Sequence, residues 1–254
     1  MSFWEHLEEL RWTIMRVIIG LGVFFIGWFA ILPSIFQHFI LGPTNANFFL
    51  YKYLDKLSGL GGFFPNFGND QFDVEIININ VTSQFMTHIS TALMMAFVTT
   101  FPYLIYELWK FISPALYENE TRNCRIAFVG GTFMFFLGCL VGYTVVFPFT
   151  FRFLTEYQLS ESIVNQISLN SYMDNFSLMI LMMGVVFELP MLIWVLSRLG
   201  LINKAFLKKY RKHAVVVLLV LAAFITPTGD PFTLMVVFLP LYLLYEFGIV
   251  LAKR

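Results

Sequence analysis

The feature that most constrains this chain is a series of long apolar runs, several of them long enough to cross a lipid bilayer. A membrane-spanning helix needs about 20 mostly apolar residues, because each residue advances about 1.5 Å along the helix axis. Four runs reach this length: Val17–Phe36, Ile79–Ile105, Ile126–Phe151 and Asn175–Leu196. Two shorter runs follow, with the turn-forming sequence Thr226–Pro231 between them: Ala214–Ile225 and Phe232–Tyr245.

The two short runs limit how the end of the chain can enter the membrane. They contain 12 and 14 residues and would span roughly 18 and 21 Å, against a hydrocarbon core of about 30 Å. Either they form a short hairpin that thins the bilayer locally, or they re-enter from one side. The sequence therefore predicts an all-α integral membrane protein with six transmembrane helices, of which the last two are short.

The composition supports a membrane protein and excludes several other classes. Hydrophobic residues make up 58% of the 254 residues and charged residues only 13%, whereas a soluble domain is about 25% charged. The formal net charge is zero, so no field attracts nucleic acid. Two cysteines and four scattered histidines form neither a disulfide framework nor a metal-binding set.

The distribution of basic residues predicts the orientation. All but three of the 16 Lys and Arg residues lie before the first run, after the second and fourth runs, or at the C-terminus. The three on the opposite side are Lys52, Lys56 and Arg152. Because cytoplasmic loops carry the excess of Lys and Arg, both termini are expected in the cytoplasm.

We expect one polytopic membrane domain over residues 1–254. Its parts are a cytoplasmic N-terminal helix (1–16), an extracytoplasmic loop (37–78) and two cytoplasmic loops (106–125 and 197–213). The acidic start of the chain has no small-residue cleavage site after the first apolar run, so no cleavable signal peptide is expected. A polar outer loop is also expected at Arg152–Ser171.

Catalytic and nucleotide-binding motifs are missing from the sequence. It contains no Gly-x-Ser-x-Gly elbow, no His-Glu-x-x-His zinc motif and no phosphate-binding glycine loop. We therefore expect neither an enzyme nor a cofactor.

Glu188 is the one acidic residue clearly at membrane depth, inside the fourth apolar run. A charged side chain there costs at least about 2.5–3.5 kcal/mol, so the carboxyl group should be protonated or face a polar cavity. Pro190 adds polarity nearby by freeing a backbone carbonyl one turn earlier. The alternative is a buried glutamate satisfied by a neighbouring hydroxyl group, with no role in function.

A second candidate is a group of carboxylates on the predicted cytoplasmic side. Glu8 and Glu9 of the N-terminal helix could meet Glu118 and Glu120 of the loop after the second run. Carboxylates on a surface that is otherwise basic can bind a guanidinium ligand. The alternative, equally compatible with the spacing, is local pairing of the loop carboxylates with Arg122 and Arg125.

Five motifs in order resemble one known family over nearly the whole chain. They are His6–Arg11, the run from Phe101-Pro102 to Phe111–Tyr117 and Glu120, Phe187–Pro190, Thr226-Pro227 with Asp230, and Pro240 with Tyr245–Gly248. The family is TatC, the core subunit of the twin-arginine protein translocase. The resemblance implies a six-span, glove-shaped receptor in the bacterial cytoplasmic (inner) membrane. It would recognise folded precursor proteins by a signal peptide with two adjacent arginines and use the proton-motive force.

The resemblance also implies the site residues. Glu9 and Glu120 match the carboxylates that bind the arginines, and Arg11, Phe111 and Pro102 match other motif positions there. Glu188 matches the intramembrane acid of the concave face. The resemblance also implies that single-span TatA-type and TatB-type subunits dock at the last two helices. The residues that match this docking region are Thr226, Pro227, Asp230 and Thr233. A homo-oligomer within the complex is implied as well.

Two positions depart from the family pattern. Leu234 stands where the family often has a polar glutamine, which puts the polar docking site in doubt. The first outer loop is longer than the compact family form, with 52–78 resembling an insertion.

Two other function classes remain open. Glu188 could serve a proton-coupled secondary transporter, although the chain lacks the internal repeat that such folds often show. The chain could also be a purely structural membrane scaffold.

Overall fold

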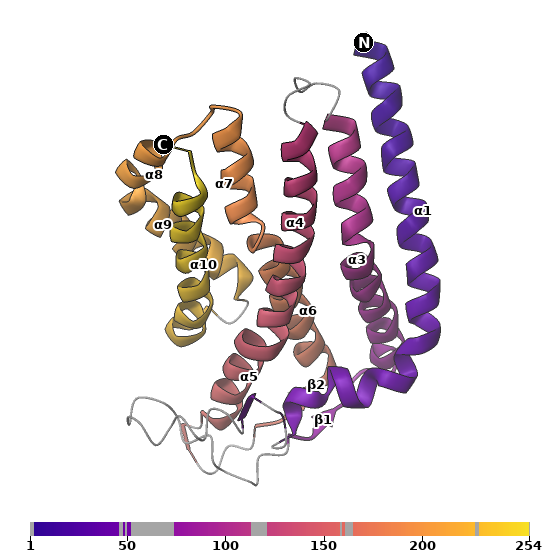
Figure 1. The fold of residues 1–254 in the computed structure, drawn as a ribbon. Coiled ribbons are helices and arrows are strands. Elements are labelled where there is room, and N and C mark those ends of the chain that lie inside the picture. Colours follow the sequence, from indigo (N-terminus) through magenta and orange to yellow (C-terminus); the bar gives the residue numbers. More distant parts are fainter. Residues whose placement is uncertain are drawn as a thin grey trace.

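The computed structural model describes residues 3–45, 48, 50–51, 74–112, 121–157, 159–160, 165–226 and 229–253. These residues are mostly helical, and the helices form an elongated bundle (Figure 1). The predicted all-α membrane fold is confirmed by this arrangement. Within the described residues, five helical segments are long and apolar enough to cross a membrane: Leu7–Thr44, Ser83–Phe111, Phe128–Glu156, Leu169–Arg198 and Pro231–Leu251.

The first two long helices form an antiparallel pair. Helix α1 (Phe3–Ile35) runs without a break from the acidic N-terminal segment into the first apolar run, as expected from the sequence. Helix α3 (Ser83–Ile112) packs against it over much of its length. Gly20 allows this close approach, because a Cβ atom there would lie 3.3 Å from the ring of Tyr103.

The next two long segments each contain a local interruption. Helix α4 (Thr121–Val141) passes through a π-helical turn (Gly142–Val146) into α5 (Phe147–Glu156). Helix α6 (Leu169–Val186) gives way to α7 (Leu189–Arg198). Pro190 explains the second interruption, because it has no N–H group to bond the carbonyl of Val186 four residues earlier.

Glycines let α4 and α6 approach closely. A Cβ atom at Gly138 would lie 2.5 Å from the carbonyl oxygen of Met183, and one at Gly184 would lie 2.6 Å from the Sγ atom of Cys139. Neither position can accept a larger side chain without moving a helix. Small residues at such contacts are typical of transmembrane helix packing, where close van der Waals contact replaces the hydrophobic effect.

The end of the chain forms a hairpin beneath a small surface helix, and only its first helix is short, because the second, Pro231–Leu251, has 21 residues and reaches the length of a membrane span. Helix α8 (Lys204–Lys209) is followed by α9 (Arg211–Ile225) and α10 (Pro231–Leu251). Asp230 caps α10, since its Oδ1 atom accepts a hydrogen bond of 2.7 Å from the backbone N–H of Thr233. At 15 residues, α9 is too short to span an ordinary bilayer unaided. In Figure 1 the hairpin stops short of the end of α5.

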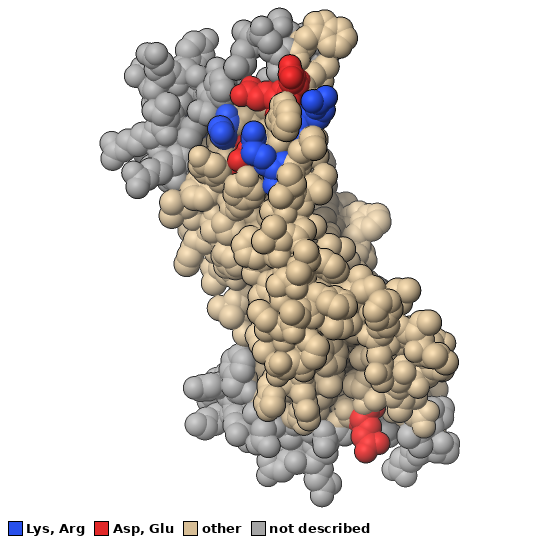
Figure 2. Space-filling view, turned by 90° about the vertical axis from the view of Figure 1, so that its right-hand side faces the viewer, with Lys and Arg blue, Asp and Glu red and all other residues tan. Residues whose placement is uncertain are grey.

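The two chain ends lie at the same end of the bundle (Figure 1). Figure 2 shows charged side chains gathered on one face at the end where α1 begins, above a broad uncharged band. This separation is what a bundle with its apolar middle in lipid requires.

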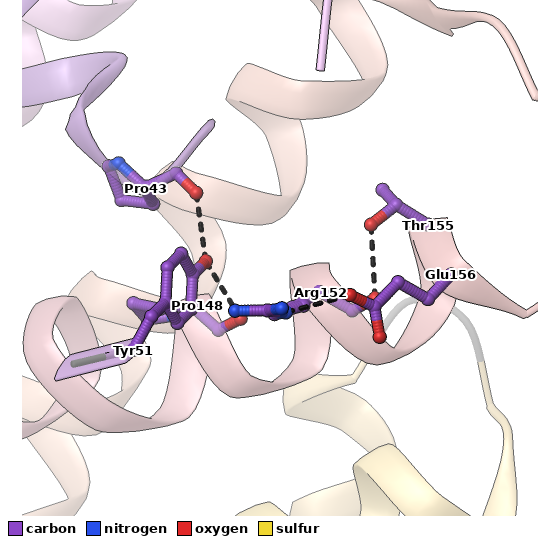
Figure 3. A network of polar contacts seen from close by, with 6 residues as sticks. All are labelled: Pro43, Tyr51, Pro148, Arg152, Thr155 and Glu156. Atoms are coloured by element: carbon purple, nitrogen blue, oxygen red, sulfur yellow. Dashed lines mark hydrogen bonds and ion pairs between the residues drawn. The ribbon is translucent and has the colours of Figure 1, made fainter. Parts of the chain in front are cut away.

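The opposite end of the bundle is closed by contacts between segments far apart in sequence. Strand β1 (Ile76–Ile77) pairs in parallel with β2 (Ile167–Ser168). Tyr51 donates hydrogen bonds to the carbonyl oxygens of Pro43 (2.8 Å) and Pro148 (3.3 Å). Its ring lies 4.8 Å from the guanidinium of Arg152 (Figure 3). We call this group, completed by Glu156, the clasp.

Arg152 corrects one expectation from the sequence. The polar outer loop expected to begin at this residue starts later, because α5 continues to Glu156. The side chain of Arg152 is 1% exposed and forms an ion pair of 2.8 Å with Glu156, one helical turn away. Burial of this cation is tolerated because an opposite charge and an aromatic face surround it.

Candidate functional site

An ion pair between α1 and α3 anchors the end of the bundle where the chain begins. The guanidinium of Arg16 lies 2.8 Å from the Oε2 atom of Glu107, whose side chain is only 4% exposed. Arg16 also donates a hydrogen bond of 3.1 Å to the hydroxyl group of Thr13. The two helices are therefore held in a defined register at this end.

Glu9 lies on the same face of α1, two turns before Arg16. Residues spaced by three or four share one side of a helix, so Glu9, Thr13 and Arg16 form one stripe toward α3. The antiparallel arrangement places Glu9 near the level of Phe111, at the end of α3. Its Oε2 atom is buried and has no hydrogen-bond partner within the described part of the chain. A buried carboxylate oxygen without a donor is costly and is the kind of group that a cationic ligand satisfies.

The other predicted residues of this site are placed as follows. Arg11 is exposed on α1, with its guanidinium 5.5 Å from the ring of Trp12. Pro102 lies inside α3 and Phe111 near its end. Glu120, with the rest of 113–120, lies outside the described residues. The structure thus brings Glu9 toward the α3 end, while the expected approach of Glu120 to Glu9 stays a prediction.

Glu188 lies at the break between α6 and α7 and faces α4. A Cβ atom at Gly131 would lie 3.0 Å from its Oε2 atom, so the glycine leaves the space that the carboxyl group occupies. The Oε1 atom is buried and has no hydrogen-bond partner among the residues placed here. The alternative in which a neighbouring hydroxyl group satisfies Glu188 finds no support in these contacts.

The residues predicted at the docking region gather at the α9–α10 turn. Thr226 is 2% exposed and donates a hydrogen bond of 3.0 Å to the carbonyl oxygen of Ala222, and Thr233 is fully buried. Asp230 caps α10, and Pro227 lies outside the described residues. These contacts shape the turn. The outward surface of the hairpin is apolar instead, and includes Val216, Val220 and Phe224 of α9 and Met235, Leu239 and Leu243 of α10.

Sequence reasoning missed the Arg16–Glu107 pair. Glu107 was expected in a cytoplasmic loop, but α3 extends to Ile112 and buries it. A carboxylate in an otherwise apolar, aromatic stretch was the available signal. Its partner is 91 residues away in sequence, so spacing could not identify it.

Comparison with known proteins identifies the family. The family profile described as "Sec-independent protein translocase protein (TatC)" matches residues 5–240. The chain belongs to the TatC family. The resemblance found in its motifs is therefore confirmed.

Curated TatC proteins are similar over almost the full length of the chain. The protein "Sec-independent protein translocase protein TatC" of Blattabacterium is 37% identical over 252 residues, covering 98% of this chain and 94% of that protein. The TatC of Helicobacter pylori (strain ATCC 700392 / 26695) is 32% identical over 248 residues, with 98% and 86% covered. The chain therefore corresponds to most of a TatC protein.

Two solved structures have the same fold. "Crystal Structure of Twin Arginine Translocase Receptor- TatC" matches with a TM-score of 0.75 at 28% identity, covering 97% of each chain. The structure of the same receptor "in DDM" gives a TM-score of 0.76 at 27% identity, covering 98% of this chain and 100% of that one. The protein is thus a multi-pass membrane component of the Sec-independent translocase.

Proposed function

We propose that this TatC protein is the receptor and core subunit of a twin-arginine translocase. It binds the signal peptides of folded precursor proteins at the cytoplasmic surface of the bacterial inner membrane. Both termini lie in the cytoplasm, and the proton-motive force drives export without a nucleotide. It assembles with single-span TatA-type and TatB-type subunits and with further copies of itself.

The observation that carries this proposal is the buried Oε2 atom of Glu9 near the end of the α1–α3 pair, which has no hydrogen-bond partner among the described residues. A guanidinium group offers planar donors that match a carboxylate, and each charge-assisted hydrogen bond contributes about 1.5–3 kcal/mol. Glu120 is proposed to hold the second arginine. Arg11, Phe111 and Pro102 would shape the surface around the two carboxylates.

The proposed docking surface for the single-span subunits is the α9–α10 hairpin. Its outward side chains are apolar, as a helix in lipid requires. Thr226 follows α9, and Asp230 and Thr233 lie at the start of α10, beside this surface. Pro227 is proposed to belong to the same docking region. Leu234 packs against the core, so the partner would meet an apolar rather than a polar surface on this part of α10.

The signal-peptide proposal is tested by crosslinking a precursor to membranes that contain Glu9→Gln, Glu120→Gln or the double variant. Each single variant should weaken crosslinking at least tenfold, because the neutral amide loses the charge-assisted bond. Glu8→Gln is the matched control, since it removes the same charge from an exposed position on the same helix. A precursor with two lysines should crosslink weakly to every variant. Unchanged crosslinking in the double variant would contradict the proposal.

A proton-coupled transporter remains the second candidate, because one oxygen of the Glu188 carboxyl group, at membrane depth, has no hydrogen-bond partner in the described ranges. Proton uptake by vesicles that contain only this chain, with no precursor present, would favour that alternative. We expect no such uptake.

A further inference from the structure

A strongly basic surface lies between α7 and α9, and the receptor function does not account for it. The segment from Leu189 to Gly229 contains no Asp or Glu. It contains six basic residues: Arg198, Lys204, Lys208, Lys209, Arg211 and Lys212. Such an excess of one sign over 41 residues forms a positive surface that attracts anions.

The protein itself neutralises only part of this charge. Arg211 forms an ion pair of 2.6 Å with Glu246 of α10, the guanidinium of Arg198 lies 5.4 Å from the ring of Trp194, and the Nζ atom of Lys209 lies 5.9 Å from the ring of Tyr210. Across the described ranges, the other four cations, which we call the lysine surface, make no ion pair: Lys204, Lys208, Lys209 and Lys212. Three of the four are exposed and Lys204 is half-buried. The lysine surface therefore faces outward with its charge unneutralised.

Helix α8, which carries three of the four lysines, is held in place by hydrogen bonds. Leu207 of α8 is buried, and its carbonyl oxygen accepts a hydrogen bond of 2.8 Å from the hydroxyl group of Tyr245. The backbone N–H of Lys204 donates to the carbonyl oxygen of Lys253 at 3.1 Å, and the N–H of Lys253 donates to Ser197 Oγ at 2.7 Å. Helix α8 is thus joined directly to α10 and, through Lys253, to α7. Its cations are presented by a fixed element and not by a free loop.

The length of α9 indicates that the lysine surface lies at the level of the membrane surface. Helix α9 has 15 residues, hence a length of about 22 Å against a hydrocarbon core of about 30 Å. With its apolar length in lipid, α9 brings Lys208, Lys209 and Lys212 to the level of the lipid phosphates. Phe206 is 48% and Leu201 69% exposed beside them. Exposed apolar side chains next to lysines are typical of an element that lies in the interface between headgroups and acyl chains.

We propose that the lysine surface binds the phosphate groups of anionic phospholipids in the adjacent leaflet, with Phe206 and Leu201 inserted between the lipids. Charge complementarity, the fixed position of α8 and the shortness of α9 all favour a lipid over an acidic protein. This binding holds the hairpin at a defined depth. The proposal does not depend on the signal-peptide site, which lies at the ends of α1 and α3.

The test uses the full chain in detergent, titrated with phosphatidylglycerol or with phosphatidylcholine and followed by native mass spectrometry. The unmodified chain should prefer phosphatidylglycerol. Lys208→Gln combined with Lys209→Gln should lower its affinity about 25-fold, since each lysine near an anionic lipid contributes about fivefold. Lys208→Arg combined with Lys209→Arg should retain the preference, because the charge is kept.

The matched control is Lys52→Gln combined with Lys56→Gln, which removes the same charge from the predicted opposite side. This variant should bind phosphatidylglycerol like the unmodified chain. An equal loss in both double variants would mean that only net charge matters, and would overturn the proposal. So would unchanged affinity in the first variant, or full competition by free glycerol phosphate. Precursor crosslinking of the same samples reports separately on the receptor function, and the first variant should leave it intact in neutral detergent.

Discussion

Two charged side chains, Arg152 in α5 and Glu188 between α6 and α7, have opposite surroundings: the first is fully buried, whereas the second is half-buried with one buried oxygen atom. Arg152 is surrounded: Glu156 lies 2.8 Å away, and the ring of Tyr51 covers its guanidinium (Figure 3). Glu188 has a space left open by Gly131 and an oxygen without a partner in the described structure. A charge that the fold satisfies internally stabilises the structure, whereas one left unsatisfied is available to a ligand or a proton.

Replacing Glu188 is the most direct test of this difference, and it should give the largest effect. Glu188→Lys should abolish transport of a folded reporter, because a fixed cation there costs about 3 kcal/mol or more and has no counter-charge. Glu188→Leu should reduce transport strongly, while Glu188→Gln, which keeps the size and hydrogen bonding of the neutral form, should be tolerated. Insertion is checked by the amount of protein in the membrane. Wild-type transport by Glu188→Leu would mean that Glu188 has no functional role.

Arg152→Met should affect stability instead of transport chemistry. It leaves Glu156 unpaired and removes the contact with Tyr51, and we expect a destabilisation of about 2 kcal/mol, since Glu156 is partly exposed. The thermal unfolding midpoint in detergent measures this loss. Arg198→Met is the control, because Arg198 lies over an aromatic ring at a similar distance but on an exposed surface. A similar small shift for both variants would contradict a structural role for the clasp.

Gly131→Ala tests whether the position of the Glu188 carboxyl group matters, without changing a charge. The added methyl group would lie 3.0 Å from the Oε2 atom of Glu188, so the carboxyl group must shift. We expect transport to fall severalfold while the protein still folds. Gly22→Ala is the matched control, because a Cβ atom there meets nothing within 4 Å, and helix propensity favours alanine. Equal transport by the two variants would show that the position of Glu188 is unimportant.

Tyr51→Phe should give the smallest change. It keeps the ring against Arg152 but removes the hydrogen bonds to Pro43 and Pro148, at a cost of about 1 kcal/mol. Burial raises the pKa of the Tyr51 hydroxyl group far above its usual value, so the group is a hydrogen-bond donor at any physiological pH. Thermal unfolding at neutral pH measures the loss. Tyr51→Leu should lose more, and an equal loss in both would show that the ring contributes nothing.

The apolar runs were sufficient to predict the long helices, because each helix in lipid must carry its own apolar length. Their ends were harder to predict. Helix α10 extends to Leu251, beyond the run that the sequence analysis closed at Tyr245. The run Phe232–Tyr245 ends before Glu246 because that residue is charged. In the structure Arg211 of α9 pairs with it, and no local pattern contains that partner.

The residues of the candidate site could likewise be predicted only in part from the sequence. Motifs identified Glu9 and Glu188, and within the part of the chain that the structure describes each has a buried carboxyl oxygen without a hydrogen-bond donor. The Arg16–Glu107 pair and the clasp were not predicted, because each joins residues tens of positions apart. Sequence patterns report on single elements, whereas these contacts depend on how the elements pack.

Helix α1 has a mechanical consequence for a receptor. Its 33 residues form an unbroken rod of about 50 Å, and rocking it by about 5° would displace one end by about 4 Å. Glu9 stands near one end. The other end continues through the π-helical turn Phe36–Ile40 into the short helix Gly42–Thr44, where the carbonyl oxygen of Pro43 accepts the hydrogen bond from Tyr51. Under the proposed receptor function, a precursor that tilted this rod at Glu9 would also move the segment around Pro43 at the opposite membrane surface.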